Sequence, residues 1–259
     1  MSQNDLPGSN HCTSKGEISV IGLGPGSEEY MTEKARQALI NSDVIVGYRT
    51  YVKLIDNFLS GKEVVVNGMT GEVERCKEAV RRAAAGAKVA VISSGDPGIY
   101  GMAGLMLEVL SEHPCGKEIN INIIPGVTAA SSAASILGAP LMHDFAVISL
   151  SDRLTAWEVI AKRLEMAAEG DFVIVLYNPR SHGRPDYLNR AIEIILKYRK
   201  PTTPVGVVRN AGREEQELWI RDLDTLPDLP VDMSSTVIIG NSQTYMLNGR
   251  LVTPRGYRL

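Results

Sequence analysis

The chain has 259 residues, of which 44% are hydrophobic and 22% charged, and its formal net charge is −3 at pH 7. This composition is typical of a globular protein and excludes the disordered and fibrous classes, while the length allows one large domain or two small ones. The negative charge and the absence of a block of consecutive Lys or Arg argue against a nucleic-acid partner.

Residues 1–16 are polar and rich in Ser, Asn and Gly, which predicts a loose tail without the apolar core of a signal sequence. No run reaches the roughly eighteen apolar residues of a membrane span, so we expect a cytoplasmic protein with no membrane partner. Cys12, Cys76 and Cys115 lie far apart and lack the C-x-x-C spacing of zinc and iron–sulfur sites. We therefore expect free thiols and no metal site.

From residue 18 onward, short β-branched runs alternate with segments of helical period, which is typical of βα units around a mainly parallel sheet. The expected strands of the first half are 18–22, 44–46, 64–66, 88–92 and 118–124. The expected helices are 32–41, 72–85, 101–112 and 128–137. These elements predict a first α/β domain over residues 17–138.

The segment 138–144 breaks this periodicity and predicts an interdomain linker, after which the alternation resumes. A second α/β domain over residues 139–259 is expected, with helices at 156–168 and 186–198. Its expected strands are 145–150, 172–177, 205–209, 217–221 and 236–240. The later strands follow one another without a helix long enough for a crossover, so part of this sheet is expected to be antiparallel.

Three expected strands of the first half end in turns of small residues. These turns are Gly22-Leu23-Gly24-Pro25-Gly26, Ser93-Ser94-Gly95-Asp96-Pro97-Gly98 and Pro125-Gly126-Val127-Thr128-Ala129. A glycine-rich turn after a strand lets backbone amides approach a ligand closely. A nicotinamide dinucleotide is not expected, because the G-x-G-x-x-G spacing fails at Ser27 and no acidic residue ends the second strand.

Together with Met31-Thr32, these turns resemble the tetrapyrrole methylase family, the methyltransferases of cobalamin and sirohaem synthesis. Within that family, the second half is similar to the precorrin-3B carbon-17 methyltransferases. The motifs that carry this likeness are His143-Asp144-Phe145, Ile148-Ser149-Leu150-Ser151-Asp152, Tyr177-Asn178-Pro179-Arg180-Ser181, Arg184 and Thr253-Pro254-Arg255-Gly256-Tyr257. The resemblance covers essentially everything after the tail.

The resemblance implies two α/β domains with an interdomain cleft that holds S-adenosylmethionine (SAM), the fold of the class III SAM methyltransferases, and a homodimer. It also implies methylation of carbon 17 of a precorrin-3B or cobalt-factor III type tetrapyrrole, with ring contraction, in cobalamin biosynthesis. Substrates with and without cobalt both fit, because neither requires a metal ligand from the protein. Two alternatives stay open: a family member that acts at a different carbon or on a non-tetrapyrrole, and a non-catalytic module that binds a tetrapyrrole or nucleotide.

By position, the family's cofactor contacts fall on Pro25, Ser94, Gly95, Asp96, Ile99, Thr128, Ala129, Asn178 and Ala211. At a strand end, Gly95 and Asp96 offer backbone amides and a carboxylate to the polar parts of SAM. Thr128 and Ala129 open an expected helix, where backbone N–H groups have no partner within the helix. The alternative interpretation is that Asp96 only shapes a tight turn or caps the next helix.

The family's substrate carries acetate and propionate groups, and arginine accepts carboxylates in a planar, bidentate fashion. The candidates beside the second-half motifs are Arg153, Arg180, Arg184, Arg209, Arg213 and Arg255, of which we expect two or three to contact substrate.

Ring contraction requires a general base, because a hydroxyl loses its proton as a carbonyl forms. His143 and Asp152 are the candidate catalytic residues, since they lie in or just beyond the expected linker. The structural alternative for His143 is a hydrogen bond to a carbonyl group.

Overall fold

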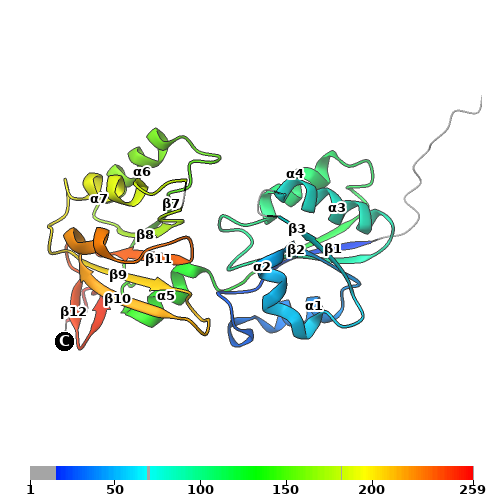
Figure 1. Cartoon of the computed structure of the whole chain (residues 1–259), viewed down its shortest axis with the longest axis horizontal. Coiled ribbons are helices and arrows are strands. Elements are labelled where there is room, and N and C mark those ends of the chain that lie inside the picture. The colour runs from blue at the N-terminus through cyan, green and yellow to red at the C-terminus, as the bar shows by residue number, and fades with distance from the viewer. Residues whose placement is uncertain (1–15, 69–70, 182, 259) are drawn as a thin grey trace, which may run out of the picture. The chain divides into compact units, whose positions relative to one another are not determined.

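The computed structural model describes residues 16–68, 71–181 and 183–258 (Figure 1). The chain divides into two compact units, Met1–Val127 and Thr128–Leu259, here called unit 1 and unit 2. The sequence analysis predicts this division between residues 138 and 139. The structure divides the chain after Val127 instead, so that helix α5 (Ala129–Leu137) falls in unit 2. The tail expected for residues 1–16 lies outside the described residues, apart from Gly16.

Unit 1 contains a five-stranded parallel sheet in the order β3-β2-β4-β1-β5, as the alternating pattern predicts. The strands are β1 (Glu17–Gly22), β2 (Val44–Tyr48), β3 (Glu63–Asn67), β4 (Lys88–Ser93) and β5 (Asn120–Ile124). The helices described between them are α1 (Glu33–Ile40), α2 (Arg49–Val52), α3 (Glu72–Ala84) and α4 (Ala103–Glu112), with short 3-10 segments at Glu28–Tyr30 and Lys53–Phe58.

Both faces of the unit 1 sheet are covered, which is why its central strands are apolar at nearly every position. Ile18 and Val20 of β1 face α3 and α4, where Val80 and Met106 are buried. The opposite face packs against α1 and α2, with Leu39 of α1 fully buried (Figure 1).

Unit 2 contains a five-stranded mixed sheet in the order β10-β9-β11-β8-β7. The strands are β7 (Phe145–Ser149), β8 (Val173–Tyr177), β9 (Pro204–Arg209), β10 (Glu217–Asp222) and β11 (Ser235–Ile239). Strands β7 and β8 are parallel, whereas β8–β11, β11–β9 and β9–β10 are antiparallel pairs. The expected antiparallel part is therefore confirmed. A small additional sheet, which the sequence did not predict, joins β6 (Gly138–Ala139), β12 (Tyr245–Leu247) and β13 (Arg250–Val252).

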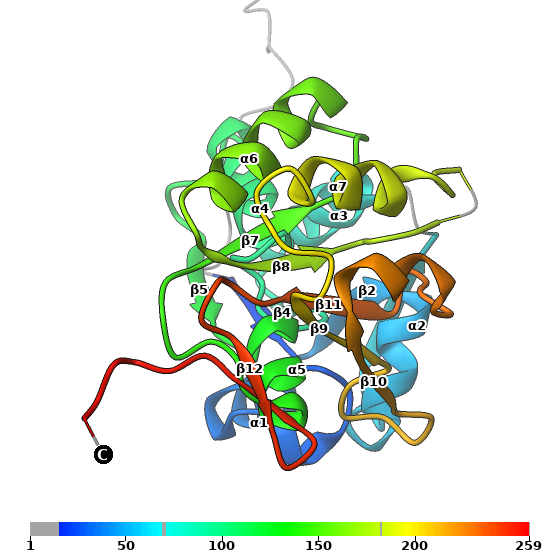
Figure 2. The ribbon, with the colours of Figure 1, turned by 90° about the vertical axis from the view of Figure 1, so that its left-hand side faces the viewer.

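Helices α6 (Trp157–Glu169) and α7 (Tyr187–Ile195) cover one face of the unit 2 sheet, and α5 (Ala129–Leu137) covers the other (Figure 2). The α5 residues Ala130 and Leu137 pack with Val175 of β8 and Ile238 of β11. Because α5 buries its apolar face on this sheet, it belongs to unit 2. The sequence analysis predicts it in the first domain, because it directly follows β5 in the chain.

Cys76 is a buried free thiol of α3, as expected. Cys115 is disulfide-bonded, which corrects the expectation of a free thiol there, and Cys12 lies outside the described residues. Among the described residues, no helix combines the length and the hydropathy that a transmembrane span requires.

Candidate active site

The three small-residue turns of unit 1 lie at one edge of its sheet. Strands β4, β1 and β5 are neighbours and parallel, so their carboxyl ends adjoin. The turn after β1 and the turn after β4 are joined directly, because Gly24 N–H donates to the Gly95 carbonyl at 3.1 Å and Gly95 N–H donates to the Gly24 carbonyl at 2.8 Å. Both glycines have positive φ, 74° and 64°. We call residues 22–26, 94–98 and 125–127 the unit 1 turn cluster.

The Asp96 carboxylate holds this cluster together. Its Oδ1 accepts from Gly98 N–H at 2.8 Å, and its Oδ2 accepts from Gly126 N–H at 3.1 Å. Each oxygen therefore has a backbone partner, one in its own turn and one in the turn after β5. These contacts support the shaping role that was the alternative interpretation of Asp96, and they leave further lone pairs on both oxygens.

Close backbone approach explains the small residues of the cluster. A Cβ added to Gly22 would lie 2.6 Å from the Gly126 nitrogen and 2.7 Å from the Gly95 oxygen. Pro25 is buried and Ser94 is half-buried, whereas Ile99, just beyond the second turn, is 40% exposed. The structure thus brings the five sequence-predicted unit 1 residues to one sheet edge: Pro25, Ser94, Gly95, Asp96 and Ile99.

Unit 2 has a comparable edge. Since β9 and β8 are both antiparallel to β11, and β7 is parallel to β8, these three strands end on the same side of the sheet. Asn178 follows β8 and Asn210 follows β9, each in the left-handed conformation (φ 52° and 51°), which asparagine tolerates better than most residues. Asn178 Nδ2 donates to Ser149 Oγ at the end of β7, at 2.9 Å. We call this the carboxyl edge of unit 2.

The start of α5 lies at the same edge, linked to β8 by Tyr177. The Tyr177 hydroxyl accepts from Ala130 N–H at 2.7 Å and shares a 2.5 Å hydrogen bond with Thr128 Oγ1. The four sequence-predicted cofactor residues of unit 2, Thr128, Ala129, Asn178 and Ala211, are therefore all at the carboxyl edge. Tyr177 was missed as a site residue, although it opens the Tyr-Asn-Pro motif.

Asp152 lies in a polar network just after β7. Arg184 Nη1 donates to Ser151 Oγ at 2.8 Å and to Asp152 Oδ1 at 3.2 Å, and Tyr187 Oη donates to Asp152 Oδ2 at 2.6 Å. The Tyr187 hydrogen bond, and then the Arg184 guanidinium, hold the pKa of Asp152 below its usual range. A carboxylate stabilised in this way is a weaker proton acceptor. Sequence reasoning missed Tyr187, which no quoted motif contains.

The arginine candidates differ in how fully their guanidinium groups are hydrogen-bonded or ion-paired. Arg180 Nη2 makes only long contacts, 3.5 Å to Asn189 Oδ1 and 3.4 Å to the Pro227 carbonyl, and its buried Nε has no partner among the described residues. Arg209 is paired with Glu217 and lies over the Trp219 ring.

The remaining three arginines occupy different places. Arg153 is exposed beside Asp152, and Arg213 lies in the turn after β9, with its N–H donating to the Asn210 carbonyl at 3.0 Å. Arg255 is exposed two residues beyond Thr253, whose hydroxyl bonds Thr244 at 2.8 Å. Thr244 follows the end of β11, on the opposite side of the sheet from the carboxyl edge. The structure therefore does not bring Arg255 to the other candidates.

The two candidate bases are separated by β7. His143 is exposed and precedes β7, where its Nδ1 accepts from Asp144 N–H at 2.9 Å, whereas Asp152 follows the strand. A five-residue strand is about 17 Å long. A single reacting carbon therefore cannot be in contact with both side chains in unit 2 as it stands.

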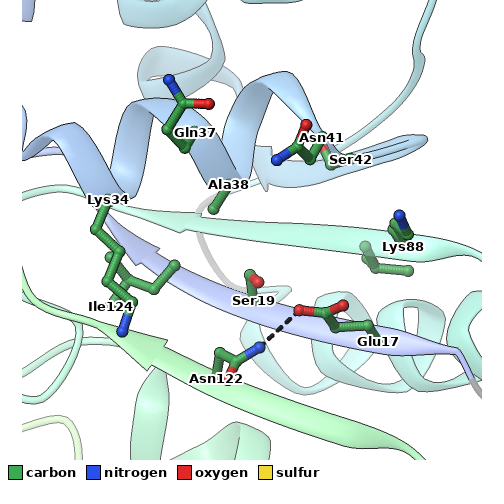
Figure 3. A pocket seen from close by; sticks show the side chains of 11 residues that line it. Glu17, Ser19, Lys34, Gln37, Ala38, Asn41, Ser42, Lys88, Asn122 and Ile124 are labelled. Carbon is green, nitrogen blue, oxygen red and sulfur yellow. Dashed lines mark hydrogen bonds between the residues drawn. The ribbon is translucent and has the colours of Figure 1, made fainter.

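A hollow of about 320 Å³ opens on another part of unit 1, between α1 and the sheet face formed by β1, β4 and β5 (Figure 3). Most of the residues that line it are polar or charged, and within it Asn122 Nδ2 donates to Glu17 Oε1 at 2.6 Å. None of the sequence-predicted cofactor residues is among those that line it. The hollow and the turn cluster are thus separate features of unit 1.

Comparison with known proteins identifies the family. The model of the Tetrapyrrole (Corrin/Porphyrin) Methylases matches residues 17–227. A protein of Salmonella typhimurium named probable cobalt-factor III C(17)-methyltransferase is 52% identical over 242 residues, which cover 93% of this chain and 100% of the relative.

Solved structures agree with this match. The crystal structure of the methyltransferase CobJ is 38% identical, with a TM-score of 0.88, and the match covers 93% of this chain and 100% of CobJ. A uroporphyrin-III C-methyltransferase from Thermus thermophilus, complexed with S-adenyl homocysteine, is 24% identical, with a TM-score of 0.66 over 87% of this chain and 92% of its own; it shares the fold. Since the family model spans most of the chain and the Salmonella relative matches over its full length, this chain belongs to the tetrapyrrole (corrin/porphyrin) methylases.

Proposed function

We propose that this protein is a SAM-dependent C-methyltransferase that methylates carbon 17 of a precorrin-3B or cobalt-factor III type tetrapyrrole and promotes ring contraction in cobalamin biosynthesis. The observation that carries the proposal is the 52% identity to a relative named for this reaction, over that relative's whole length. The second-half motifs support the choice of carbon, because substrate selection is expected there rather than in the cofactor turns.

The proposed cofactor, SAM, supplies a methyl group on a sulfonium that is itself the leaving group. The residues proposed to hold it are Pro25, Ser94, Gly95, Asp96, Ile99, Thr128, Ala129, Asn178 and Ala211. In unit 1, this is supported by the carboxyl ends of three neighbouring parallel strands, which meet at the turn cluster, because ligands of open α/β sheets bind beyond such strand ends. In unit 2, support comes from the amides that open α5 beside Asn178. Asp96 would then fix the shape of the turns that receive the cofactor.

For the substrate carboxylates, Arg180 and Arg184 are the arginines that the geometry favours. Arg180 has a buried donor without a partner among the described residues, and a carboxylate would satisfy it. The Arg184 side chain is 11% exposed and is oriented by Ser151 and Asp152, so it is preorganised for a second carboxylate. The Nε of Arg209 is likewise buried without a partner among the described residues, but its guanidinium is paired with Glu217 and lies over the Trp219 ring. Arg153 and Arg213 complete the proposed set in unit 2, and Arg255, which the structure does not bring to the other candidates, is included in it on the family resemblance alone.

The proton transfer of ring contraction is proposed for His143 or Asp152. Their separation along β7 means that variants of the two should behave differently. We expect His143→Ala or Asp152→Asn, but not both, to stop ring contraction under single-turnover conditions while SAM still binds. Loss of ring contraction in both variants, with SAM binding retained, would contradict this assignment.

The direct test is incubation of the purified protein with trimethylated corrin precursor and SAM carrying a ¹³C-methyl group. The expected product is one methyl heavier, has a changed absorption spectrum and carries the label on carbon 17 by NMR. Label on another carbon would favour the different-carbon alternative. Binding of SAM with every such substrate left untouched would favour the non-catalytic module and reject the proposed enzyme.

The proposal includes a homodimer and a cytoplasmic location, as the sequence and the family resemblance suggest. Sedimentation equilibrium and cell fractionation test these two points independently of activity.

A further inference from the structure

The hydroxyl group of Tyr177 caps the N-terminus of α5, which the side chain of the helix's own N-cap residue does not do. Thr128 is the N-cap of α5, with extended backbone (φ −70°, ψ 153°), but its side chain makes no capping hydrogen bond. An N-cap oxygen ordinarily accepts from the second or third backbone N–H of the helix. Here Ala130 N–H, the second of α5, donates instead to Tyr177 Oη at 2.7 Å. The cap of α5 is thus supplied by β8.

The same hydroxyl also engages Thr128. Tyr177 Oη and Thr128 Oγ1 are 2.5 Å apart, and a phenol can accept from an amide while it donates to an alcohol. The Thr128 hydroxyl is thereby held in a fixed position. The Ala130 amide and the Thr128 hydroxyl at the start of α5 are therefore both hydrogen-bonded to one atom of β8, Tyr177 Oη.

The residue after Tyr177 is held at the same strand end. It is the last residue of β8, in register with Ser149 of β7, and Asn178 leaves the strand in the left-handed conformation with its side chain bonded to Ser149. The Tyr177 ring packs against the core cluster that contains Ala130 and Val175. The start of α5 and the exit of β8 are therefore set relative to each other through a single side chain.

We propose that Tyr177 is a positioning residue for the cofactor, which holds Thr128 and Ala129 in place beside Asn178 through its hydroxyl group. This inference rests on the proposed function in one respect, namely that these residues bind SAM. It assigns Tyr177 no contact with the cofactor and no part in proton transfer.

The test uses Tyr177→Phe, which deletes the hydroxyl and keeps the ring in the core. S-adenosylhomocysteine is the probe, and its affinity is measured by calorimetry. Two neutral hydrogen bonds of ordinary strength are lost, so we expect affinity to fall about 10-fold. In the ligand-free variant, the Ala130 amide should exchange with solvent deuterium faster than in the wild type. In turnover, KM for SAM should rise while kcat at saturating SAM changes little.

Tyr198→Phe is the matched control. The Tyr198 hydroxyl donates to Glu165 Oε1 at 3.1 Å in an exposed contact away from α5, and its loss should leave both the probe affinity and the Ala130 exchange unchanged. Thr128→Val is the second variant, which removes the Thr128 hydroxyl but keeps the Ala130–Tyr177 hydrogen bond. Its effect should be smaller than that of Tyr177→Phe, and the double variant should lose less than the sum of the two.

The outcomes separate this inference from the proposed function. If the wild type does not bind the probe, the proposed function fails and the inference fails with it. If the wild type binds but Tyr177→Phe binds within two-fold of it, only the inference is overturned. Should Tyr177→Phe not fold, Thr128→Val and its KM-against-kcat split decide, and unchanged probe affinity in that variant rejects the positioning role.

Discussion

Asp96 shows how a residue predicted to face a ligand also organises the protein. Its two carboxylate oxygens accept backbone N–H groups of Gly98 and Gly126, from two different turns. We expect Asp96→Ala to lower the free energy of unfolding by about 1–3 kcal/mol, because both amides lose a charged acceptor. The same variant should bind S-adenosylhomocysteine more weakly, since the cluster loses its shape.

Urea denaturation and calorimetry measure the two effects, with Asp56→Ala, an exposed aspartate, as the control. Asp96→Asn keeps one acceptor oxygen and should fall between the wild type and Asp96→Ala. A variant with full stability but no probe binding would show that Asp96 acts on the ligand alone.

The lowered pKa of Asp152 predicts that the stability of the fold depends on pH. Its folded pKa is lowered by the Tyr187 hydrogen bond and by Arg184, so its stabilising effect is present above the unfolded pKa of about 4 and is lost as pH falls through the folded value. We expect Tyr187→Phe to raise the pKa of Asp152 toward its ordinary value. A ¹³C carboxyl NMR titration measures this shift. An unchanged titration would mean that Arg184 alone sets the value.

Residue-level sequence reasoning succeeded where the signal was local. The small-residue turns and the polar strand ends were visible as motifs, and the structure brings them to sheet edges. The partners of those residues were not predictable, because Asp96 reaches Gly126 and Tyr177 reaches Thr128 only after the strands have paired. No sequence motif contains Tyr187, so its hydrogen bond to Asp152 could not be predicted.

The close packing of the turn cluster requires glycine at position 22, where β1 ends. A Cβ at Gly22 would lie within 2.8 Å of the Gly126 nitrogen, the Gly95 oxygen and Pro97 Cδ, and two of these are backbone atoms that cannot rotate away. Gly104 in α4 has nothing within 4 Å of the same position. We therefore expect Gly22→Ala to destabilise unit 1 by about 1–3 kcal/mol or more.

Gly104→Ala should raise stability by about 1 kcal/mol, because alanine is the better helix former. Thermal and urea unfolding compare the pair, and probe binding should be lost only in Gly22→Ala. Equal stability of the two variants would show that the turns relax at little cost.

At the level of elements, hydrophobic period predicted which segments form helices and strands but not which sheet each helix covers. Helix α5 is the clearest case, since its apolar face suits either unit and only its packing on Val175 and Ile238 assigns it to unit 2. The strands β6, β12 and β13 were missed because two or three residues are too few for a pattern of period two.

For the whole molecule, each unit has its own buried clusters, one on either face of its sheet. The residues proposed for the cofactor are found in both units. We therefore expect S-adenosylhomocysteine to slow amide hydrogen exchange at the unit 1 turn cluster and also at the carboxyl edge of unit 2, around Ala130, Asn178 and Asn210. At a hundred times its Kd, a ligand that binds only the folded state stabilises it by about 2.7 kcal/mol.

Hydrogen exchange read by mass spectrometry resolves these segments in one experiment. The strands β12 and β13 carry none of the proposed cofactor residues and serve as the internal control, whose exchange should not change. Protection limited to one unit would mean that the residues proposed in the other do not bind the cofactor. In that case Asn178 and Ala211, or else Pro25 and Asp96, would have to be reassigned to substrate binding or to structure.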